Sequence, residues 1–208
     1  MTVEKLYISY NNIHKLCQET AERLKSSGNK PDIIVAIGGG GFIPARILRS
    51  FIREPNEKNI PIQAIGLSLY ESMGKNSTVD TIGKEVVRTQ WLDFSAIEKH
   101  FDSLIGKKIL IVDEVDDTRT TLHYALSELE KDINKQAEIL GRADETTTFS
   151  IFVLHNKDKP KKQQLPTELI SSERYIAART VPDVWIAYPW DAADIDYHTD
   201  MARLQGNI

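Results

Sequence analysis

The stretch ILIVDEVDDTRTT, residues 109–121, decides the fold of this chain. Its first four residues form a continuous apolar run of strand length, which is typical of a strand covered on both faces in a parallel sheet. Acidic residues follow directly, and then a turn rich in hydroxyl side chains. The next apolar residues have the three-and-four spacing of an amphipathic helix: Leu122, Ala125, Leu126 and Leu129. The pattern predicts a strand, a loop and a helix in that order.

The loop between this strand and this helix has the composition of an anion site. A helix N-terminus offers unpaired backbone N–H groups and the positive end of a dipole, so small hydroxyl residues there can cradle a phosphate. Asp113 and Glu114 would repel that phosphate unless they bind sugar hydroxyls or a divalent cation. A phosphorylated sugar satisfies both halves of the loop. The alternative is a capped helix after a core strand, with no ligand.

Four consecutive glycines, residues 38–41, follow a second apolar run at residues 33–37. Glycine lets the backbone approach a ligand closely. The spacing is neither the GxGxxG of dinucleotide-binding folds nor the Gly-Lys-Ser/Thr ending of a P-loop, which counts against both. The alternative is a tight turn from strand to helix without a ligand.

Other apolar runs predict further strands at residues 62–70, 86–89, 149–154 and 184–188. Strands that alternate with helices indicate an α/β fold with a mostly parallel, doubly wound sheet, whose ligands bind at the carboxyl ends of the strands. The first helix is expected to be capped by Asn11 or Asn12. The lysine-rich residues 157–162 are expected to form a solvated loop.

Length and composition limit the possible classes of protein. The 208 residues suit one domain, 1–208, and the formal net charge of −4 argues against general affinity for nucleic acid. Cys17 is the only cysteine, which excludes an intrachain disulfide. The sequence has neither an apolar signal core nor an apolar stretch of membrane-spanning length. These features predict a cytoplasmic protein with no membrane partner.

The run VDEVDDTRTT, preceded by ILI, resembles the signature of the type I phosphoribosyltransferases. The resemblance implies their fold, a mostly parallel sheet flanked by helices, with a mobile lid at about residues 71–88 and a small base-binding hood at about 156–208. It also implies transfer of a 5-phosphoribosyl group from phosphoribosyl pyrophosphate, with Mg²⁺ as cofactor. Two residues depart from the usual pattern. Arg119 stands where many members have Gly, and Asp116 where a small or apolar residue is typical.

The resemblance also implies roles for individual residues. Asp113 and Glu114 would bind the ribose hydroxyls, and Asp117 would be the general base for the purine proton. The residues expected at the 5′-phosphate are Thr118, Arg119, Thr120 and Thr121. The remaining candidates for phosphoribosyl pyrophosphate are Asp116, the Gly38, Gly39 and Gly40 turn with a cis peptide bond near Gly38 and Gly39, the lid residues Ser68 and Tyr70, and Arg88 as a cation for pyrophosphate.

The stretch TVPDVWIAYPWD, residues 180–191, offers the base-binding residues that the resemblance implies. Trp185 would stack on the purine, and Ile186 would present its backbone to the base edge. Asp191 would lie near the C2 side of the purine or near magnesium, to which Glu114 is the other candidate ligand. Lys157 is the candidate for binding the 6-oxo group. Two alternatives remain for other candidates: Arg88 as a surface salt-bridge partner and Trp185 as a core residue.

Longer stretches, among them YISYNNIHKLCQ, GGGGFIPARILRSF and RTQWLDF, resemble the fungal purine-salvage phosphoribosyltransferases. The stretches NIPIQAIGLSLYE, HFDSLIGKK, FVLHNKDKPK and PWDAADI are more similar to the xanthine branch than to the hypoxanthine-guanine branch. The resemblance therefore implies transfer to a 6-oxopurine, with xanthine favoured, by a homodimer. The alternatives are a hypoxanthine-guanine enzyme and a nucleotide-sensing regulator on the same fold that has no activity.

Overall fold

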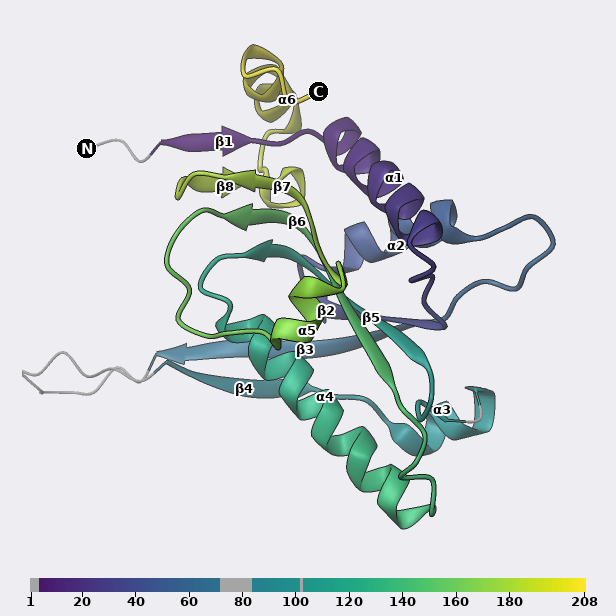
Figure 1. Ribbon diagram of the computed structural model, residues 1–208. Helices are drawn as coiled ribbons and strands as arrows, with labels where there is room; N and C mark the ends of the chain where they lie inside the picture. Colours follow the sequence, from purple (N-terminus) through teal and green to yellow (C-terminus); the bar gives the residue numbers. More distant parts are fainter. Residues whose placement is uncertain (1–3, 72–83, 102) are drawn as a thin grey trace, which may run out of the picture.

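The structure is a computed structural model that describes residues 4–71, 84–101 and 103–208 (Figure 1). The strands are β1 Lys5–Tyr7, β2 Ile33–Gly38, β3 Ile62–Glu71, β4 Lys84–Gln90, β5 Lys108–Asp116, β6 Thr148–Lys157, β7 Tyr175–Val181 and β8 Trp185–Ala187. The helices are α1 Tyr10–Ser26, α2 Phe42–Ile52, α3 Phe94–Phe101, α4 Thr120–Ile139, α5 Thr167–Ser171 and α6 Ile195–Leu204, with the 3-10 helix η1 Pro189–Asp191.

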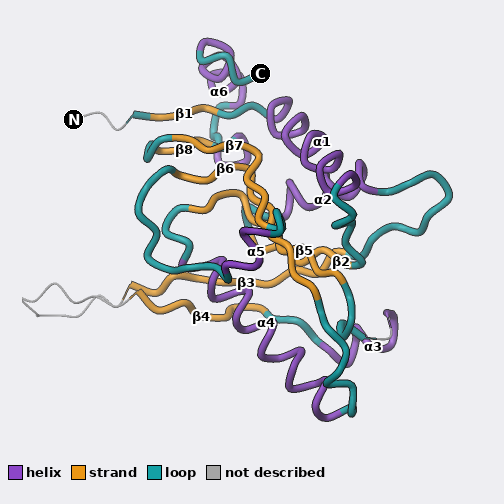
Figure 2. The backbone as a smooth tube through the Cα atoms, in the orientation of Figure 1, coloured by secondary structure: helices purple, strands orange, loops and turns teal. Residues whose placement is uncertain are grey.

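Six strands form the main sheet in the order β4-β3-β2-β5-β6-β7, and its neighbours are parallel except for the antiparallel pair β3 and β4. Helices α1 and α2 lie on one face of this sheet, and α3 and α4 on the other (Figure 2). The central strands are buried on both faces, because Ile34 and Ala36 pack toward α1 and α2 while Ile33 and Val35 pack toward α4. The predicted α/β class and doubly wound sheet are confirmed.

The order of the strands reverses between β2 and β5. Their pairing ends at Ala36 and Val112, whereas β5 remains paired with β6 as far as Asp116 and Asn156. The last four residues of β5 therefore project past the end of the β2 ladder. In open α/β sheets this reversal, at the carboxyl ends of the strands, is where ligands bind.

Three expected boundaries differ from the structure. The strand at 109–112 continues to Asp116, since its pairing with β6 continues, so the acidic residues lie within the strand rather than after it. Helix α1 begins at Tyr10, and its cap is Ser9, whose Oγ accepts a hydrogen bond from the Asn12 backbone N at 3.1 Å. The strand expected at 184–188 is the shorter β8, which pairs with β1 instead of joining the main sheet.

Strands β1 and β8, with η1 and α6, form a small layer above the main sheet (Figure 1). Segments far apart in the sequence are joined there. The Tyr7 backbone N donates to Gln205 Oε1 at 2.8 Å, the Gln205 side chain donates to the Lys5 carbonyl at 2.9 Å, and the Asn207 side chain donates to the Tyr7 carbonyl at 3.1 Å. The small layer is thus closed by residues from both ends of the described chain.

Most of the lid expected at 71–88, residues 72–83, lies outside the described residues. Its flanks are the ends of the β3 and β4 hairpin, where Tyr70 pairs with Glu85. Among the helices of the described ranges, none combines the length and the apolar character needed to cross a membrane.

Candidate functional site

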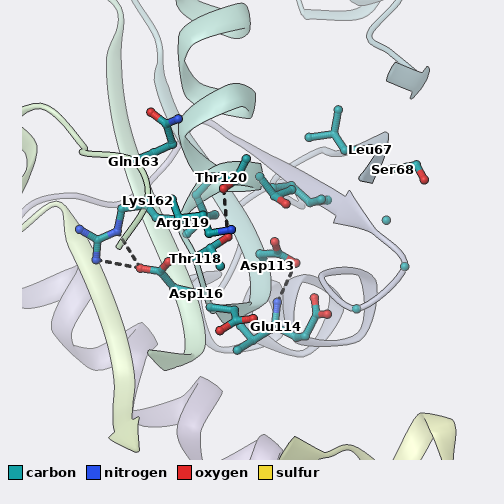
Figure 3. Close-up of a pocket in the computed structure, with 18 residues that line it drawn as sticks. Leu67, Ser68, Asp113, Glu114, Asp116, Thr118, Arg119, Thr120, Lys162 and Gln163 are labelled. Atoms are coloured by element: carbon teal, nitrogen blue, oxygen red, sulfur yellow. Dashed lines mark hydrogen bonds and ion pairs between the residues drawn. The ribbon is translucent and has the colours of Figure 1, made fainter. Parts of the chain in front are cut away.

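A cavity of about 600 Å³ lies at the carboxyl ends of β2 and β5 (Figure 3). The β2–α2 turn forms one wall, and the end of β5 with the start of α4 forms another. The sequence-predicted residues that line it are Gly38, Gly39, Gly40, Ser68, Asp113, Glu114, Asp116, Asp117, Thr118, Arg119, Thr120 and Thr121. The reversal of strand order therefore brings three segments to one cavity: the glycine turn (residues 38–41), the acid pair (Asp113 and Glu114) and the loop rich in hydroxyl side chains (residues 117–121).

The glycine turn fits against the end of β5 because it has no side chains. The peptide bond between Gly38 and Gly39 is cis, as the resemblance implied. A Cβ on Gly40 would lie 2.1 Å from Glu114 Oε2, and one on Gly41 would lie 2.4 Å from the Val112 carbonyl oxygen. The turn can thus bring its backbone directly beside the acid pair.

Hydrogen bonds from the backbone and from Tyr188 hold the acid pair, Asp113 and Glu114, in place. Asp113 is buried, its Oδ1 accepts from the Glu114 backbone N at 2.9 Å, and burial, with the neighbouring Glu114 charge, raises the pKa of its carboxyl group well above the ordinary value. The Glu114 carbonyl accepts from the Tyr188 hydroxyl at 3.0 Å, and His155 Nδ1 lies 2.9 Å from the same hydroxyl. Because that hydroxyl has one proton, His155 Nδ1 is the donor to it.

The two residues that depart from the family pattern lie at the end of β5 and in the loop that follows it, and they bind each other. Arg119 has a left-handed backbone, φ 69°, which Gly adopts more readily. Its Nε and Nη2 donate to Asp116 Oδ2 at 2.9 and 2.8 Å, as the dashed lines in Figure 3 show. The Tyr175 hydroxyl donates to the same oxygen at 2.6 Å, and the Arg119 guanidinium lies 5.0 Å from the Tyr175 ring. Asp116 therefore fixes the unusual Arg119 in place.

The expectation of a solvated loop at residues 157–162 is right for only part of the segment: Asp158, Pro160 and Lys162 are exposed, whereas Lys157, Lys159 and Lys161 are partly buried. Lys161 is 11 % exposed, and its Nζ donates to the carbonyls of Asp116 at 2.8 Å, Asp117 at 2.9 Å and Lys157 at 2.8 Å. Burial lowers the pKa of the Lys161 ammonium group. The Lys162 backbone N donates to the Thr118 carbonyl at 3.0 Å, and Lys162 and Gln163 line the cavity. The sequence shows these lysines only as a run of charge, and nothing in it indicates the carbonyl oxygens at the ends of β5 and β6 that Lys161 binds.

Three of the predicted purine-binding residues line a second cavity, of about 490 Å³, in the small layer: Trp185, Ile186 and Asp191. The Trp185 side chain is 61 % exposed, whereas Tyr188 is buried and stacks on Trp190 at 4.6 Å. The Trp185 N–H donates to the Glu4 carbonyl and the Ala187 carbonyl accepts from the Ile8 N–H, at the two ends of β1. Since successive residues of a strand direct their backbone groups to opposite edges, those of Ile186 point away from β1.

Lys157 belongs to a cluster of four charged side chains beside the first cavity. Its Nζ is 3.7 Å from Asp117 Oδ1 and 3.5 Å from Asp183 Oδ1, and Lys159 Nζ is 2.7 and 3.0 Å from the same two atoms. Asp117 belongs to the wall of the first cavity, and Asp183 precedes Trp185 by two residues. Through Asp117 and Asp183 the cluster thus connects the wall of the first cavity with the segment that leads into β8.

Arg88 and Tyr70 are not placed in the first cavity by the described residues. The Arg88 guanidinium binds the carboxylates of Glu128 and Asp132 on α4 and lies 4.0 Å from the Trp91 ring. This is the surface salt-bridge role that the sequence left open as the alternative. The Tyr70 side chain lies outside the described part of the structure. Asp191 and Glu114, the two candidate magnesium ligands, line different cavities.

Comparison with known proteins gives a family match over residues 9–145, to the phosphoribosyl transferase domain. Xanthine phosphoribosyltransferase 1 of Saccharomyces cerevisiae is 66% identical over 98% of both chains. Hypoxanthine-guanine phosphoribosyltransferase of the same yeast is 57% identical over 98% of this chain and 93% of that protein. The Schizosaccharomyces pombe protein of that name is 55% identical, over 98% of this chain and 97% of the relative.

Two solved structures extend the comparison to the fold. A hypothetical protein from Neisseria gonorrhoeae, solved with bound ppGpp, has a TM-score of 0.76 and 36% identity over 99% of both chains. A purine phosphoribosyltransferase from Pyrococcus horikoshii has a TM-score of 0.61 and 23% identity over 91% of this chain and 95% of that one. At this identity, the similarity to the Pyrococcus protein shows a shared fold only.

Proposed function

The chain belongs to the phosphoribosyltransferase family, and we propose that it transfers a 5-phosphoribosyl group from phosphoribosyl pyrophosphate to a 6-oxopurine in purine salvage. Xanthine is the proposed acceptor, which gives xanthosine 5′-monophosphate and pyrophosphate. The observation that carries this choice is the 66% identity, over nearly the full length, to the yeast enzyme named for xanthine. Hypoxanthine and guanine are the second candidates, because relatives named for them are 57% and 55% identical.

The first cavity supports the phosphoribosyl half of this reaction. Breaking the bond at the anomeric carbon leaves positive charge on the sugar and negative charge on pyrophosphate. Asp113 and Glu114 would hold the ribose hydroxyls and so orient the ring. The start of α4, with Thr118, Thr120 and Thr121, would bind the 5′-phosphate through hydroxyl groups and free helix N–H groups. The backbone of residues 38–40 would receive the pyrophosphate.

Asp117 is the proposed general base. As the purine nitrogen forms its bond to the anomeric carbon, the proton of the five-membered ring would pass to the Asp117 carboxylate, while the electron pair of the breaking bond leaves with pyrophosphate. Asp117 suits this role because it belongs to the wall of the phosphate cavity and yet has a side chain that is 44 % exposed to an incoming base.

Trp185 and Ile186 are the proposed contacts for the base. An exposed, flat indole ring offers a stacking surface, and stacking on an aromatic side chain contributes roughly 1–3 kcal/mol per base. The backbone groups of Ile186 that point away from β1 are available to the edge of the purine. Lys157, whose ammonium group lies between Asp117 and Asp183, is the proposed donor to the 6-oxo group.

Magnesium is the proposed cofactor. Mg²⁺ prefers oxygen ligands and is usually held by one or two carboxylates together with substrate phosphates and water. The donor set at the end of β5 fits this pattern, with Glu114 on the cavity wall beside the Gly40 backbone. Bound with pyrophosphate, the ion would neutralise charge on the leaving group. Asp191 remains a further proposed ligand on the side of the base.

We also propose that the protein works as a homodimer in the cytoplasm, on small molecules rather than on nucleic acid or membranes. The family supports the dimer, and the net charge of −4 supports ligands other than nucleic acid. Residues 72–83 are proposed to belong to the lid, with Ser68 and Tyr70 at its base. A nucleotide-sensing regulator is the competing class, and the Neisseria protein with bound ppGpp is the observation that favours it.

Pyrophosphate release separates these functions. Purified protein, Mg²⁺ and phosphoribosyl pyrophosphate would be combined with xanthine, hypoxanthine, guanine or adenine in parallel. The proposal requires release that depends on a 6-oxopurine, with the largest kcat/KM for xanthine. Nucleotide binding without release for any base would support the regulator instead.

Asp117→Asn provides the internal control for this assay. The amide keeps the size and polarity of the side chain but cannot take up the proton, so we expect kcat to fall by about 10²-fold or more, with product nucleotide still bound. Unchanged turnover would show that Asp117 is not the base.

A further inference from the structure

Lys159 is placed against the proposed catalytic acid more closely than Lys157 is. Its Nζ lies 2.7 Å from Asp117 Oδ1, compared with 3.7 Å for Lys157, and 3.0 Å from Asp183 Oδ1. The side chain is 24 % exposed, and its hydrogen bonds to Asp117 and Asp183 raise the pKa of its ammonium group, so the positive charge is retained. A second fixed cation therefore stands beside Asp117, which lines the first cavity, and beside Asp183, which precedes Trp185 by two residues.

The charges of this cluster balance only while Asp117 is ionised. Lys157 and Lys159 face Asp117 and Asp183, which gives two positive and two negative groups. When Asp117 takes up the proton of the purine, one negative charge is lost and both ammonium groups remain. A base held between Asp117 and Trp185, as the proposed function places it, would then be the group beside them that can supply negative charge.

We propose that Lys159 is a specificity-determining residue that, together with Lys157, stabilises negative charge on the purine and so favours a 2,6-dioxopurine over a purine with one oxo group. The inference rests on the proposed function. In this proposal the site selects its base by the negative charge that the base carries, and not by the shape of the base.

The preference follows from the acidity of the bases. A second carbonyl group withdraws electrons from the ring and spreads the negative charge left by a lost proton over another oxygen. Xanthine is for this reason a stronger acid than hypoxanthine and places more negative charge on its oxygens at neutral pH. Hydrogen bonds from ammonium groups to charged acceptors are stronger than those to neutral carbonyls. Two cations thus discriminate between the bases more strongly than one.

The test compares wild type with Lys159→Gln, Lys159→Arg and Lys131→Gln, by measuring kcat/KM for xanthine and for hypoxanthine at saturating phosphoribosyl pyrophosphate. Lys131→Gln is the matched control, because it removes one positive charge from an ammonium group that is 72 % exposed on α4. We expect Lys159→Gln to lower the ratio of xanthine to hypoxanthine kcat/KM roughly tenfold, as for the loss of one hydrogen bond to a charged group. Lys159→Arg and Lys131→Gln should preserve the ratio.

A second measurement removes the dependence on turnover. The affinities of folded wild type and Lys159→Gln for xanthosine and inosine 5′-monophosphate would be determined by calorimetry, and the variant should lose affinity for the xanthine nucleotide selectively. Equal losses for both bases and both nucleotides would overturn the inference, since a lysine that only holds its loop affects them alike. If wild type releases no pyrophosphate with any base, the proposed reaction fails, and the nucleotide affinities alone decide the role of Lys159.

Discussion

Arg119 keeps a left-handed backbone conformation beside the phosphate cavity because neighbouring side chains hold its guanidinium group. Asp116 supplies an oxygen to two of its nitrogens, and Tyr175 packs on it and donates to that same oxygen. Burial, together with the Asp116 hydrogen bond, raises the pKa of the Tyr175 hydroxyl, so it remains a donor at neutral pH. The backbone of a loop that would bind a phosphate is thus fixed by hydrogen bonds among the side chains of Asp116, Arg119 and Tyr175.

The pairing of Asp116 with Arg119 can be tested by a double-mutant cycle. The Asp116 side chain has no exposure, so Arg119→Gly should leave a buried carboxylate short of donors and lower the free energy of unfolding by about 3 kcal/mol. Asp116→Val with Arg119→Gly should recover most of this loss, because the buried charge is then removed as well. Urea unfolding of the four proteins measures the coupling. Additive effects of the two substitutions would contradict it.

Both residues are visible in the sequence as departures from a pattern, but their pairing is not. The separation of three residues along a loop does not predict a contact, and Tyr175 comes from β7, a strand that the sequence did not predict. The same holds for Lys161, whose partners are backbone carbonyls. The sequence therefore predicted the residues of the phosphate loop and missed the ones that hold it.

At the scale of whole elements, the end of β5 is supported by a relay of hydrogen bonds that crosses three segments. His155 on β6 donates to Tyr188, between β8 and η1, and Tyr188 donates to the Glu114 carbonyl on β5. Burial lowers the pKa of His155 to about 4, and the charge of Arg179 contributes to the shift. The imidazole in this relay is therefore neutral near pH 7, and its proton is on Nδ1.

The lowered pKa of His155 predicts that the stability of the protein depends on pH. The pKa of His155 is depressed on folding from 6.5 to about 4, so its contribution is complete above 6.5 and is lost as the pH falls toward 4. We expect the free energy of unfolding to fall by up to about 3 kcal/mol over this interval. Urea unfolding at several pH values, for wild type and His155→Gln, measures the difference, and the variant should show a flatter profile.

Asp113 acts in the opposite direction over the same interval, because its pKa is raised and the stability it contributes is lost as the pH rises. The comparison with His155→Gln cancels this effect, since both proteins keep Asp113. Parallel profiles for the two proteins would show that His155 does not carry the change.

The strand, loop and helix order was predictable from the sequence because periodicity and composition are local. Burial on both faces gave β2 and β5 their continuous apolar runs. The length of β5 was not predictable, since pairing with β6 carries it through polar residues that the sequence indicates as loop. For β8, the sequence predicted a strand and gave no sign of its partner, which lies at the other end of the described chain.

Considered as a whole, the molecule has a first cavity at the main sheet, proposed for the sugar phosphate, and a second cavity in the small layer, proposed for the base. The small layer is closed by Gln205 and Asn207, whose side chains bind the backbone of β1, and β1 in turn pairs with the strand of Trp185. The position of the proposed stacking residue therefore depends on contacts that are distant from the phosphate cavity.

Replacement of both Gln205 and Asn207 by Ala should separate the two halves of the site. The change removes three side-chain hydrogen bonds to β1, so we expect KM for the purine to rise roughly tenfold, with KM for phosphoribosyl pyrophosphate changed much less. Arg203→Gln is the control, since it removes an exposed ion pair within α6 and leaves β1 untouched. Equal rises in both KM values would argue against separate halves.

The contact of Gln205 with β1 can form only late in synthesis on the ribosome. Tyr7 is made early, and its partner Gln205 is added 198 residues later. Every residue that lines the phosphate cavity has been added once Gln163 is made. Translation therefore supplies the residues proposed for the sugar phosphate first and the residues proposed to place the purine last. A nascent chain that stalls between the two has only the first set.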